Sequence, residues 1–247
     1  MENTVAIGAR SRWTAERRFY TGMALAMLVA AYVGFARSFF LRPLFPEWPS
    51  PSEPIFYVHG AFFSAWCVLL VIQAVLVGAG RTDVHRKLGL LGVIVAVGMV
   101  ILGVVGALIA ANRPAGFIGV PVPPLQFLVV PLFDMAFFVG FFGLALANRT
   151  NPQSHKRWMV LATVNLLAAA FARWPYVWEI GNPFVYFGLA YLFIVALAVW
   201  DFRTRGNLHP VTRWGGLALI VSLPARLALS GTALWLAFAT WLTGLVH

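Results

Sequence analysis

The feature that most constrains the fold is a series of long apolar runs separated by short polar breaks. Seven such runs occur, at 19–40, 55–79, 88–111, 125–148, 158–174, 183–200 and 213–245. A bilayer core about 30 Å thick needs roughly 20 apolar residues per helix. The chain is also 61% hydrophobic and only 11% charged, whereas soluble domains carry roughly one-quarter charged residues. We therefore expect an all-α membrane protein, with residues 1–247 forming one domain of seven transmembrane helices.

The last run, 213–245, is too long for one straight span. At about 1.5 Å per residue it would reach roughly 50 Å. Pro224 lies within it, and a proline inside a helix removes a backbone donor and favours a kink. The sequence therefore predicts a break near Pro224.

The lysines and arginines predict the orientation, because cytoplasmic loops retain positive charge during insertion. Thirteen of the eighteen fall on one side of the predicted spans: Arg10, Arg12, Arg17, Arg18, Arg81, Arg86, Lys87, Arg149, Lys156, Arg157, Arg203, Arg205 and Arg213. Four fall on the other side: Arg37, Arg42, Arg113 and Arg173. We expect a cytoplasmic N-terminus and an external C-terminus. The cations are spread over several loops, which argues against nucleic acid as a partner and for the lipid bilayer.

An internal repeat relates the second run to the fourth. The second carries polar, aromatic and amide residues at matched offsets: His59, Phe63, Trp66, Leu70 and Gln73. The fourth carries their counterparts: Asp134, Phe138, Phe141, Ala145 and Asn148. This pattern predicts a duplicated helix pair, spans two and three matching spans four and five, that builds a four-helix core.

Four ionisable residues fall inside or at the edge of predicted spans: His59, Asp134, Arg173 and Arg226. Charge inside a membrane costs a few kcal/mol, so each group needs a partner or a purpose. One interpretation is an ion pair of Asp134 with Arg226 that fixes helix packing. The other is a polar intramembrane cluster with aromatic walls that binds a small ligand, a quinone head or a proton.

A histidine followed by two cations begins both the third and the fifth span, in DVHRKLGLLG and SHKRWMVLAT. If the two helix pairs face each other, His85 and His155 lie at similar depth, as the axial ligands of a b-type haem require. Arg86 and Arg157 would then be placed for the propionates. Two alternatives stay open. The histidines can sit among cations that contact headgroups, or His85, His155 and His209, with Asp83 or Asp201, can hold one metal ion.

The words HRKLGLLG and HKRWMVLAT, with YVHGAFFSAW and LSGTALWLAFATWL, resemble a family of uncharacterised bacterial polytopic inner-membrane proteins. More distantly, the chain resembles four-helix b-type cytochromes, over spans two to five. That second resemblance implies haem on paired histidines, and only His85 and His155 match it. The position that corresponds to His59 in the repeat is Asp134, so a second haem on the external side has no ligand pair.

Conventional hydrolase and nucleotide chemistry has no support in the sequence, which contains no glycine-rich phosphate loop and no nucleophile elbow. The single cysteine, Cys67, excludes a disulfide framework. The expected function is a haem-binding membrane redox component in electron transport. A non-catalytic accessory subunit of a larger membrane complex is the alternative, and a small-molecule or proton carrier is a third.

Overall fold

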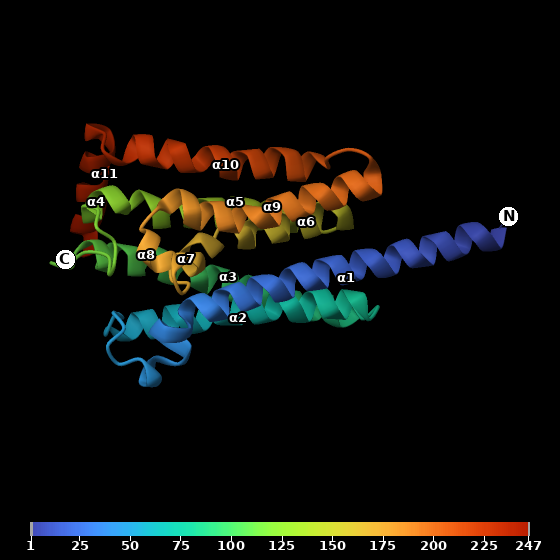
Figure 1. Cartoon of the computed structure of the whole chain (residues 1–247), viewed down its shortest axis with the longest axis horizontal. Coiled ribbons are helices and arrows are strands. Elements are labelled where there is room, and N and C mark those ends of the chain that lie inside the picture. Colours follow the sequence, from blue (N-terminus) through green and yellow to red (C-terminus); the bar gives the residue numbers. More distant parts are fainter. Residues whose placement is uncertain (1, 247) are drawn as a thin grey trace.

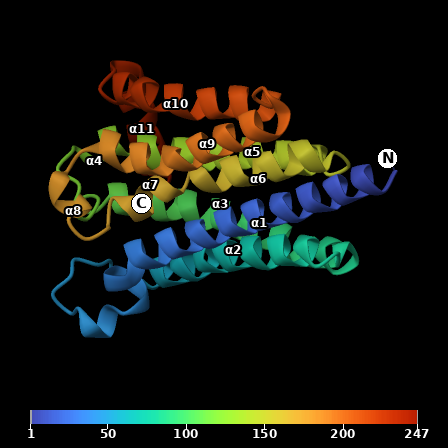
Figure 2. The same cartoon turned by 45° about the vertical axis from the view of Figure 1, so that its right-hand side comes forward.

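The computed structural model describes the backbone of residues 2–246 and the side chains of residues 14–246. In this part of the chain every regular element is a helix and there is no strand. The long helices run side by side along one axis (Figures 1 and 2). They are α1 (Glu2–Phe35), α2 (Pro54–Gly78), α3 (Thr82–Ala111), α5 (Val129–Ala147), α6 (Pro152–Val164), α9 (Pro183–Arg205) and α10 (Pro210–Ser230). The shorter helices are α4 (Pro124–Phe127), α7 (Leu167–Phe171), α8 (Val177–Ile180) and α11 (Ala233–Thr243), with η1 (Ala36–Phe40), η2 (Arg42–Leu44) and η3 (Gly244–Val246).

Among the described residues, five helices are long and apolar enough to cross a bilayer, and a sixth crossing results if α10 and α11 count together. The five are Thr14–Phe40, Pro54–Gly78, Thr82–Ala111, Pro124–Ala147 and Pro183–Arg205. Several apolar helices of this length make the chain a multi-pass membrane protein. The expected fifth span, 158–174, is not one continuous helix, because the chain divides it into α6 and α7 at Asn165 and Leu166.

The last apolar segment breaks, but not where the proline predicts. Helix α10 continues through Pro224 to Ser230, and α11 then leaves it at 85°. The new helix begins at Thr232, whose Oγ1 accepts a hydrogen bond from the Trp235 N–H at 3.2 Å. A threonine in this capping position satisfies a free donor of the first turn, so Gly231 and Thr232 stop one helix and start another. The break predicted near Pro224 is therefore wrong.

The bundle has two chemically different ends (Figure 1). We call the end with the turns at 79–81, 148–151 and 206–209 the basic end. The opposite end holds the segments 41–53, 112–123 and 172–182, and α11 crosses the bundle there. The cations that the sequence assigns to one side flank the basic end, except that the side chains of Arg10 and Arg12 lie outside the described residues.

Close backbone contacts and one hydrogen-bonded indole hold the helices together. A Cβ built on Gly34 would lie 2.3 Å from the carbonyl oxygen of Ala170, so α1 meets α7 at a point where only glycine fits. The buried Trp66 ring on α2 packs edge-on against Phe138 of α5, with ring centroids 5.0 Å apart. Its Nε1–H donates to Thr163 Oγ1 of α6 at 3.1 Å. Trp66 therefore joins the two helix pairs that the repeat relates.

Candidate functional site

Two histidine rings meet near the basic end, one from the first turns of α3 and one from the first turns of α6. The ring centroids of His85 and His155 are 6.3 Å apart and the rings are perpendicular. The Nδ1–H of His155 donates to the Ala145 carbonyl at 2.8 Å, which leaves Nε2 as the free nitrogen of that ring. The Nδ1 atom of His85 is buried and has no hydrogen-bond partner among the described residues. Imidazole nitrogens are common ligands of transition-metal ions.

The cations beside this pair divide into two kinds. Arg86 and Lys87, next to His85, are exposed. Arg157 is not available to a ligand, because its side chain is almost fully buried and paired with Asp201. Arg157 is therefore not placed to bind a propionate, contrary to the prediction from the sequence, and instead forms a buried ion pair with Asp201.

The three-histidine metal alternative is not assembled in the described part of the chain. No group of three or more histidine, cysteine, aspartate or glutamate residues there is arranged to hold an ion. His209 is the N-cap of α10, and its Nδ1 accepts a hydrogen bond from the Val211 N–H at 3.1 Å. Asp83 is exposed and pairs with Arg81 at 3.5 Å. Neither residue joins His85 and His155 as a third ligand.

A closed polar network lies beside the histidine pair, and Asp201 of α9 is its centre. One carboxylate oxygen accepts from two nitrogens of Arg157, including Nε at 3.1 Å. The other accepts from the backbone N–H of His209 at 3.1 Å and from Thr212 Oγ1 at 2.6 Å. Asp201 is 0% and Arg157 1% exposed, so both charges are removed from solvent and both are satisfied by protein groups.

The network continues to α1 through α6. Arg157 also donates to the backbone carbonyl and the side-chain oxygen of Gln153, at 2.7 and 2.8 Å. Gln153 donates in turn to Glu16 at 3.0 Å, and Lys156 forms an ion pair with the same carboxylate. Four helices, α1, α6, α9 and α10, are therefore joined at the basic end.

His209 bonds to Asp201 through its backbone N–H, and its ring caps α10 in the neutral form. Burial, followed by the positive charge of Arg157, lowers the pKa of His209 from 6.5 to about 4. A neutral ring is also what its capping bond requires, since Nδ1 acts as an acceptor there. The lowered pKa of His209 and its hydrogen bond from Val211 therefore both indicate that the ring serves as a neutral helix cap.

A second buried ion pair lies in the interior of the bundle, between α5 and α10. Arg226 is 0% exposed and donates to Asp134 Oδ1 at 2.5 Å. A second donation reaches Asn165 Oδ1 at 3.3 Å, and Asn165 donates to the backbone carbonyl of Asp134 at 2.6 Å. The guanidinium lies 5.4 to 5.7 Å from three ring centroids, those of Phe133, Phe137 and Phe187. The ion pair suggested by the sequence is thus present, with Asn165 as a third member.

This interior pair is less completely satisfied than the basic-end network. The Nε atom of Arg226 is buried without a hydrogen-bond partner among the described residues. Buried polar atoms of this kind are uncommon in native structures, and each requires an explanation such as a bound molecule or a functional role.

The other two members of the predicted intramembrane cluster lie apart from Asp134 and Arg226. His59 stacks on Phe63 with centroids 4.2 Å apart and faces Gly106 of α3, and its Nδ1 is buried without a partner in the described structure. Arg173 donates to the Ala169 carbonyl at 2.7 Å and lies over the Phe35 ring. The structure therefore separates the four-residue cluster into one ion pair and two single side chains.

At the opposite end, Arg113 and Glu53 form an ion pair at 2.6 Å that ties the start of α2 to the segment after α3. The hydrogen bond from Arg113 lowers the pKa of the Glu53 carboxyl. The same guanidinium lies 4.4 Å from the Phe56 ring centroid. This pair is half-exposed and acts as a clamp on the loop.

Sequence reasoning missed Asn165, Glu16, Gln153 and Thr212 of these sites, and it missed the role of Asp201. Asn165 lies in an apolar run, where an amide signals an internal partner. Asp201 was considered only as a metal ligand, although a single acid at the end of a span crowded with arginines signals an ion pair.

No protein-family model, no curated protein and no solved structure matches the chain.

Proposed function

We propose that the chain is a multi-pass protein of the bacterial inner membrane that transfers electrons through one b-type haem held by His85 and His155. The basic end, with its exposed arginines and lysines, faces the cytoplasm in this proposal, because positive loops are retained there. The observation that carries the proposal is the histidine pair, with centroids 6.3 Å apart and a buried His85 Nδ1 without a partner.

The surroundings of the pair support a ligand role. A histidine that binds metal almost always donates its other ring N–H to a carbonyl or carboxylate, which fixes the ring and the free nitrogen. His155 has this arrangement with Ala145. Gln73 of α2 donates to the His85 carbonyl at 3.2 Å, which holds the first turn of α3 in place.

Exposed cations on the same turn complete the proposed site. Arg86 and Lys87 are free to approach the propionates, whereas Arg157 stabilises the neighbouring network. When bound, a haem at this position supplies one-electron redox chemistry. A membrane quinone is the partner class that fits a site close to the bilayer surface.

The absorption spectrum of the protein purified after expression with ample haem tests this proposal. We expect a Soret band that is lost in His85→Ala and in His155→Ala. His209→Asn is the matched control, since it changes a third histidine at the same end and preserves the helix cap. Absence of the band, or an unchanged band in the double alanine variant, would refute the haem proposal. Co-purifying partners without a band would favour the accessory-subunit alternative.

A second candidate function, carriage of a proton or a small anion, rests on the interior ion pair. Arg226 keeps one buried N–H donor without an acceptor among the described residues, and three aromatic rings lie around its guanidinium. An anion bound to Arg226, or a proton bound to Asp134, would weaken the attraction between the two charges. Asp134→Asn in proteoliposomes is expected to abolish uptake or proton movement, and an unchanged flux would remove this candidate.

A further inference from the structure

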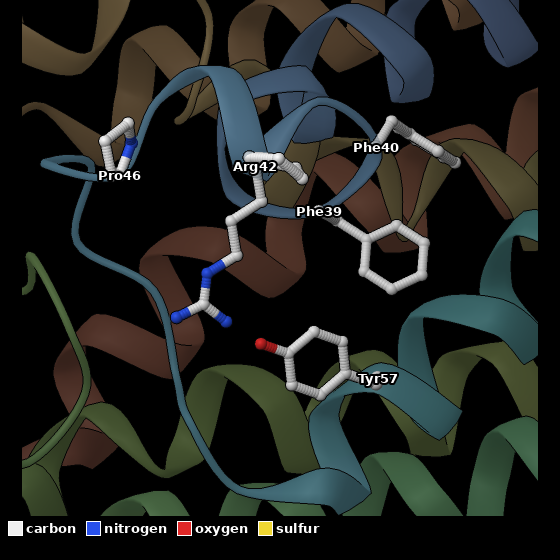
Figure 3. Close-up of a pocket in the computed structure, with 6 residues that line it drawn as sticks. Phe39, Phe40, Arg42, Pro46 and Tyr57 are labelled. Carbon is white, nitrogen blue, oxygen red and sulfur yellow. The ribbon is translucent and has the colours of Figure 1, made fainter.

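A hollow of about 540 Å³ lies at the opposite end, where α1 ends and α2 begins (Figure 3). It is lined by Phe39, Phe40, Arg42, Pro43, Pro46 and Tyr57. Its size falls in the range of about 300 to 1,000 Å³ that is typical of small-molecule sites. It is separate from the histidine pair, which lies near the basic end.

Two polar groups face this hollow. The Arg42 guanidinium and the Tyr57 hydroxyl point toward each other in Figure 3, and the guanidinium lies 5.5 Å from the Tyr57 ring centroid. One nitrogen of Arg42 donates to the Pro51 carbonyl at 3.1 Å, which orients the side chain. No carboxylate among the described residues forms an ion pair with Arg42. Its remaining N–H donors are available to an anion.

The neighbouring arginines at this end are already engaged. Arg113 pairs with Glu53 at 2.6 Å. Arg37 lies 4.7 Å from a Trp48 ring centroid, in a cation–π contact within the loop. Arg42 thus differs from Arg113 in having no carboxylate partner among the described residues, and from Arg37 in lining the hollow.

A smaller apolar hollow shares one wall residue with the first. It has a volume of about 60 Å³, and Phe40 lines both hollows. Most of its other walls are apolar side chains of α1, α2 and α7, and Trp66 and Thr163 are at its wall. A polar hollow that shares the Phe40 wall with an apolar one suits a molecule with an anionic head and a hydrocarbon tail.

The position along the chain gives the level in the membrane. Phe40 is the last residue of one candidate span and Tyr57 lies in the first turn of the next. The hollow is therefore at the height where headgroups meet hydrocarbon, and aromatic residues are enriched at that level. A π-helical turn, Ala36–Phe40, ends α1 here and places Phe39 and Phe40 at its wall.

We propose that this hollow binds one acidic phospholipid of the surrounding leaflet. The phosphate accepts hydrogen bonds from Arg42 and from the Tyr57 hydroxyl, and one acyl chain follows Phe40 toward the smaller hollow. Arginine suits this role because its planar fork matches the oxygens of a phosphate. A zwitterionic lipid is bound less well, since its ammonium group opposes the Arg42 charge.

Native mass spectrometry of the delipidated full chain in mild detergent tests the proposal, with palmitoyl-oleoyl phosphatidylglycerol, the matching phosphatidylcholine and palmitate as probes. We expect one phosphatidylglycerol per chain, bound about tenfold more tightly than phosphatidylcholine. Arg42→Gln should remove this preference, and Tyr57→Phe should weaken binding by roughly two- to tenfold. Arg37→Gln is the matched control, because Arg37 lies in the same segment but contacts Trp48, and it should retain the preference.

Each other outcome overturns the proposal. Equal binding of the two phospholipids by the wild-type chain excludes recognition of the acidic head. Unchanged phosphatidylglycerol binding in both Arg42→Gln and Tyr57→Phe places the lipid elsewhere. Palmitate that displaces phosphatidylglycerol at equal concentration shows that a free carboxylate, rather than a phospholipid, is the occupant. Tyr57→Phe removes only one hydroxyl, so it keeps the test decisive if Arg42→Gln alters the loop.

Discussion

The molecule contains two buried arginine–aspartate pairs that differ in how fully they are satisfied. Asp201 accepts from two nitrogens of Arg157, from the His209 backbone and from Thr212, and both of its oxygens are used. Asp134 receives one side-chain donation, from Arg226, whose Nε is left without a partner in the described structure. The pair at the basic end is therefore fully hydrogen-bonded to protein groups, which we call closed. The pair in the interior leaves one donor without an acceptor among the described residues, which we call open.

This difference indicates a structural role for the first pair and leaves the second pair able to bind a proton or a ligand. A buried charge pair stabilises only where further hydrogen bonds satisfy its remaining lone pairs and protons. The Arg157–Asp201 network meets that condition and joins four helices. The Asp134–Arg226 pair does not, so it retains capacity for a proton or a ligand. Variants of the two pairs should respond differently, in the order that follows.

Breaking the basic-end network should have the largest effect. Asp201→Ala leaves the Arg157 charge buried and unpaired, and this is expected to cost about 3 to 5 kcal/mol, or roughly 6 to 20 °C in Tm. Thermal unfolding of the purified protein in detergent measures it. The double variant Arg157→Met with Asp201→Leu removes both charges and should recover most of the loss. A double variant as unstable as the single one would contradict this account.

The interior pair should show an asymmetry between its two partners. Asp134→Asn leaves a guanidinium that cannot lose its charge, and an unpaired arginine at this depth is expected to cost about 2.5 to 3.5 kcal/mol. Arg226→Gln leaves a carboxyl that can take up a proton and so avoid a buried charge. We therefore expect Asp134→Asn to lower Tm more than Arg226→Gln. The reverse order would mean that Arg226 is stabilised by something other than Asp134.

The closed network should also depend on pH through His209. Its pKa is lowered from 6.5 to about 4 in the folded protein, so the unfolded chain binds the proton more readily. Its neutral form then contributes fully above pH 6.5, and stability falls as the pH drops from 6.5 toward 4. Tm measured over this range should decline less in His209→Asn, which keeps the helix cap. Equal declines would exclude His209 as the titrating group.

The half-exposed pair at the opposite end should have the smallest effect. Glu53→Gln removes an ion pair of a type worth about 0.2 to 1 kcal/mol, so Tm should fall by less than about 4 °C. The lowered pKa of Glu53 means that its contribution is present above the usual carboxyl value of 4.5 and is lost as the pH falls below it. A fall in Tm as large as that of Asp201→Ala would show that the Arg113–Glu53 ion pair stabilises the helix bundle and not only the loop.

The sequence was informative where a polar residue interrupts an apolar run. Asp134 and Arg226 stand out for this reason, and their ion pair was expected before their contact was known. His85 and His155 could be placed together because the repeat puts both at the start of matching helices. The all-helical membrane fold follows from composition and run length alone.

Other features depend on partners far away in the chain. Arg157 resembles its neighbours in HKRW, and only the contact with Asp201, 44 residues later, distinguishes it. Thr232 is a local signal for a helix start after Gly231. The sequence prediction instead placed the break at Pro224, because proline is the stronger helix breaker. The split lies at Asn165, whose amide bonds to groups of two other helices, Asp134 and Arg226, and the segment 158–174 contains no proline or glycine that would predict it.

The division of the segment 158–174 into α6 and α7 has a consequence for biogenesis. When this segment leaves the ribosome, the side-chain partners of Arg157 and Asn165 on α9 and α10 are still 44 and 61 residues from being made. At about 5 to 20 residues per second, that delay is roughly 2 to 12 seconds. The segment is therefore synthesised with polar groups whose final partners do not yet exist. The contacts of these two side chains with α9 and α10 form only when the last third of the chain has been made.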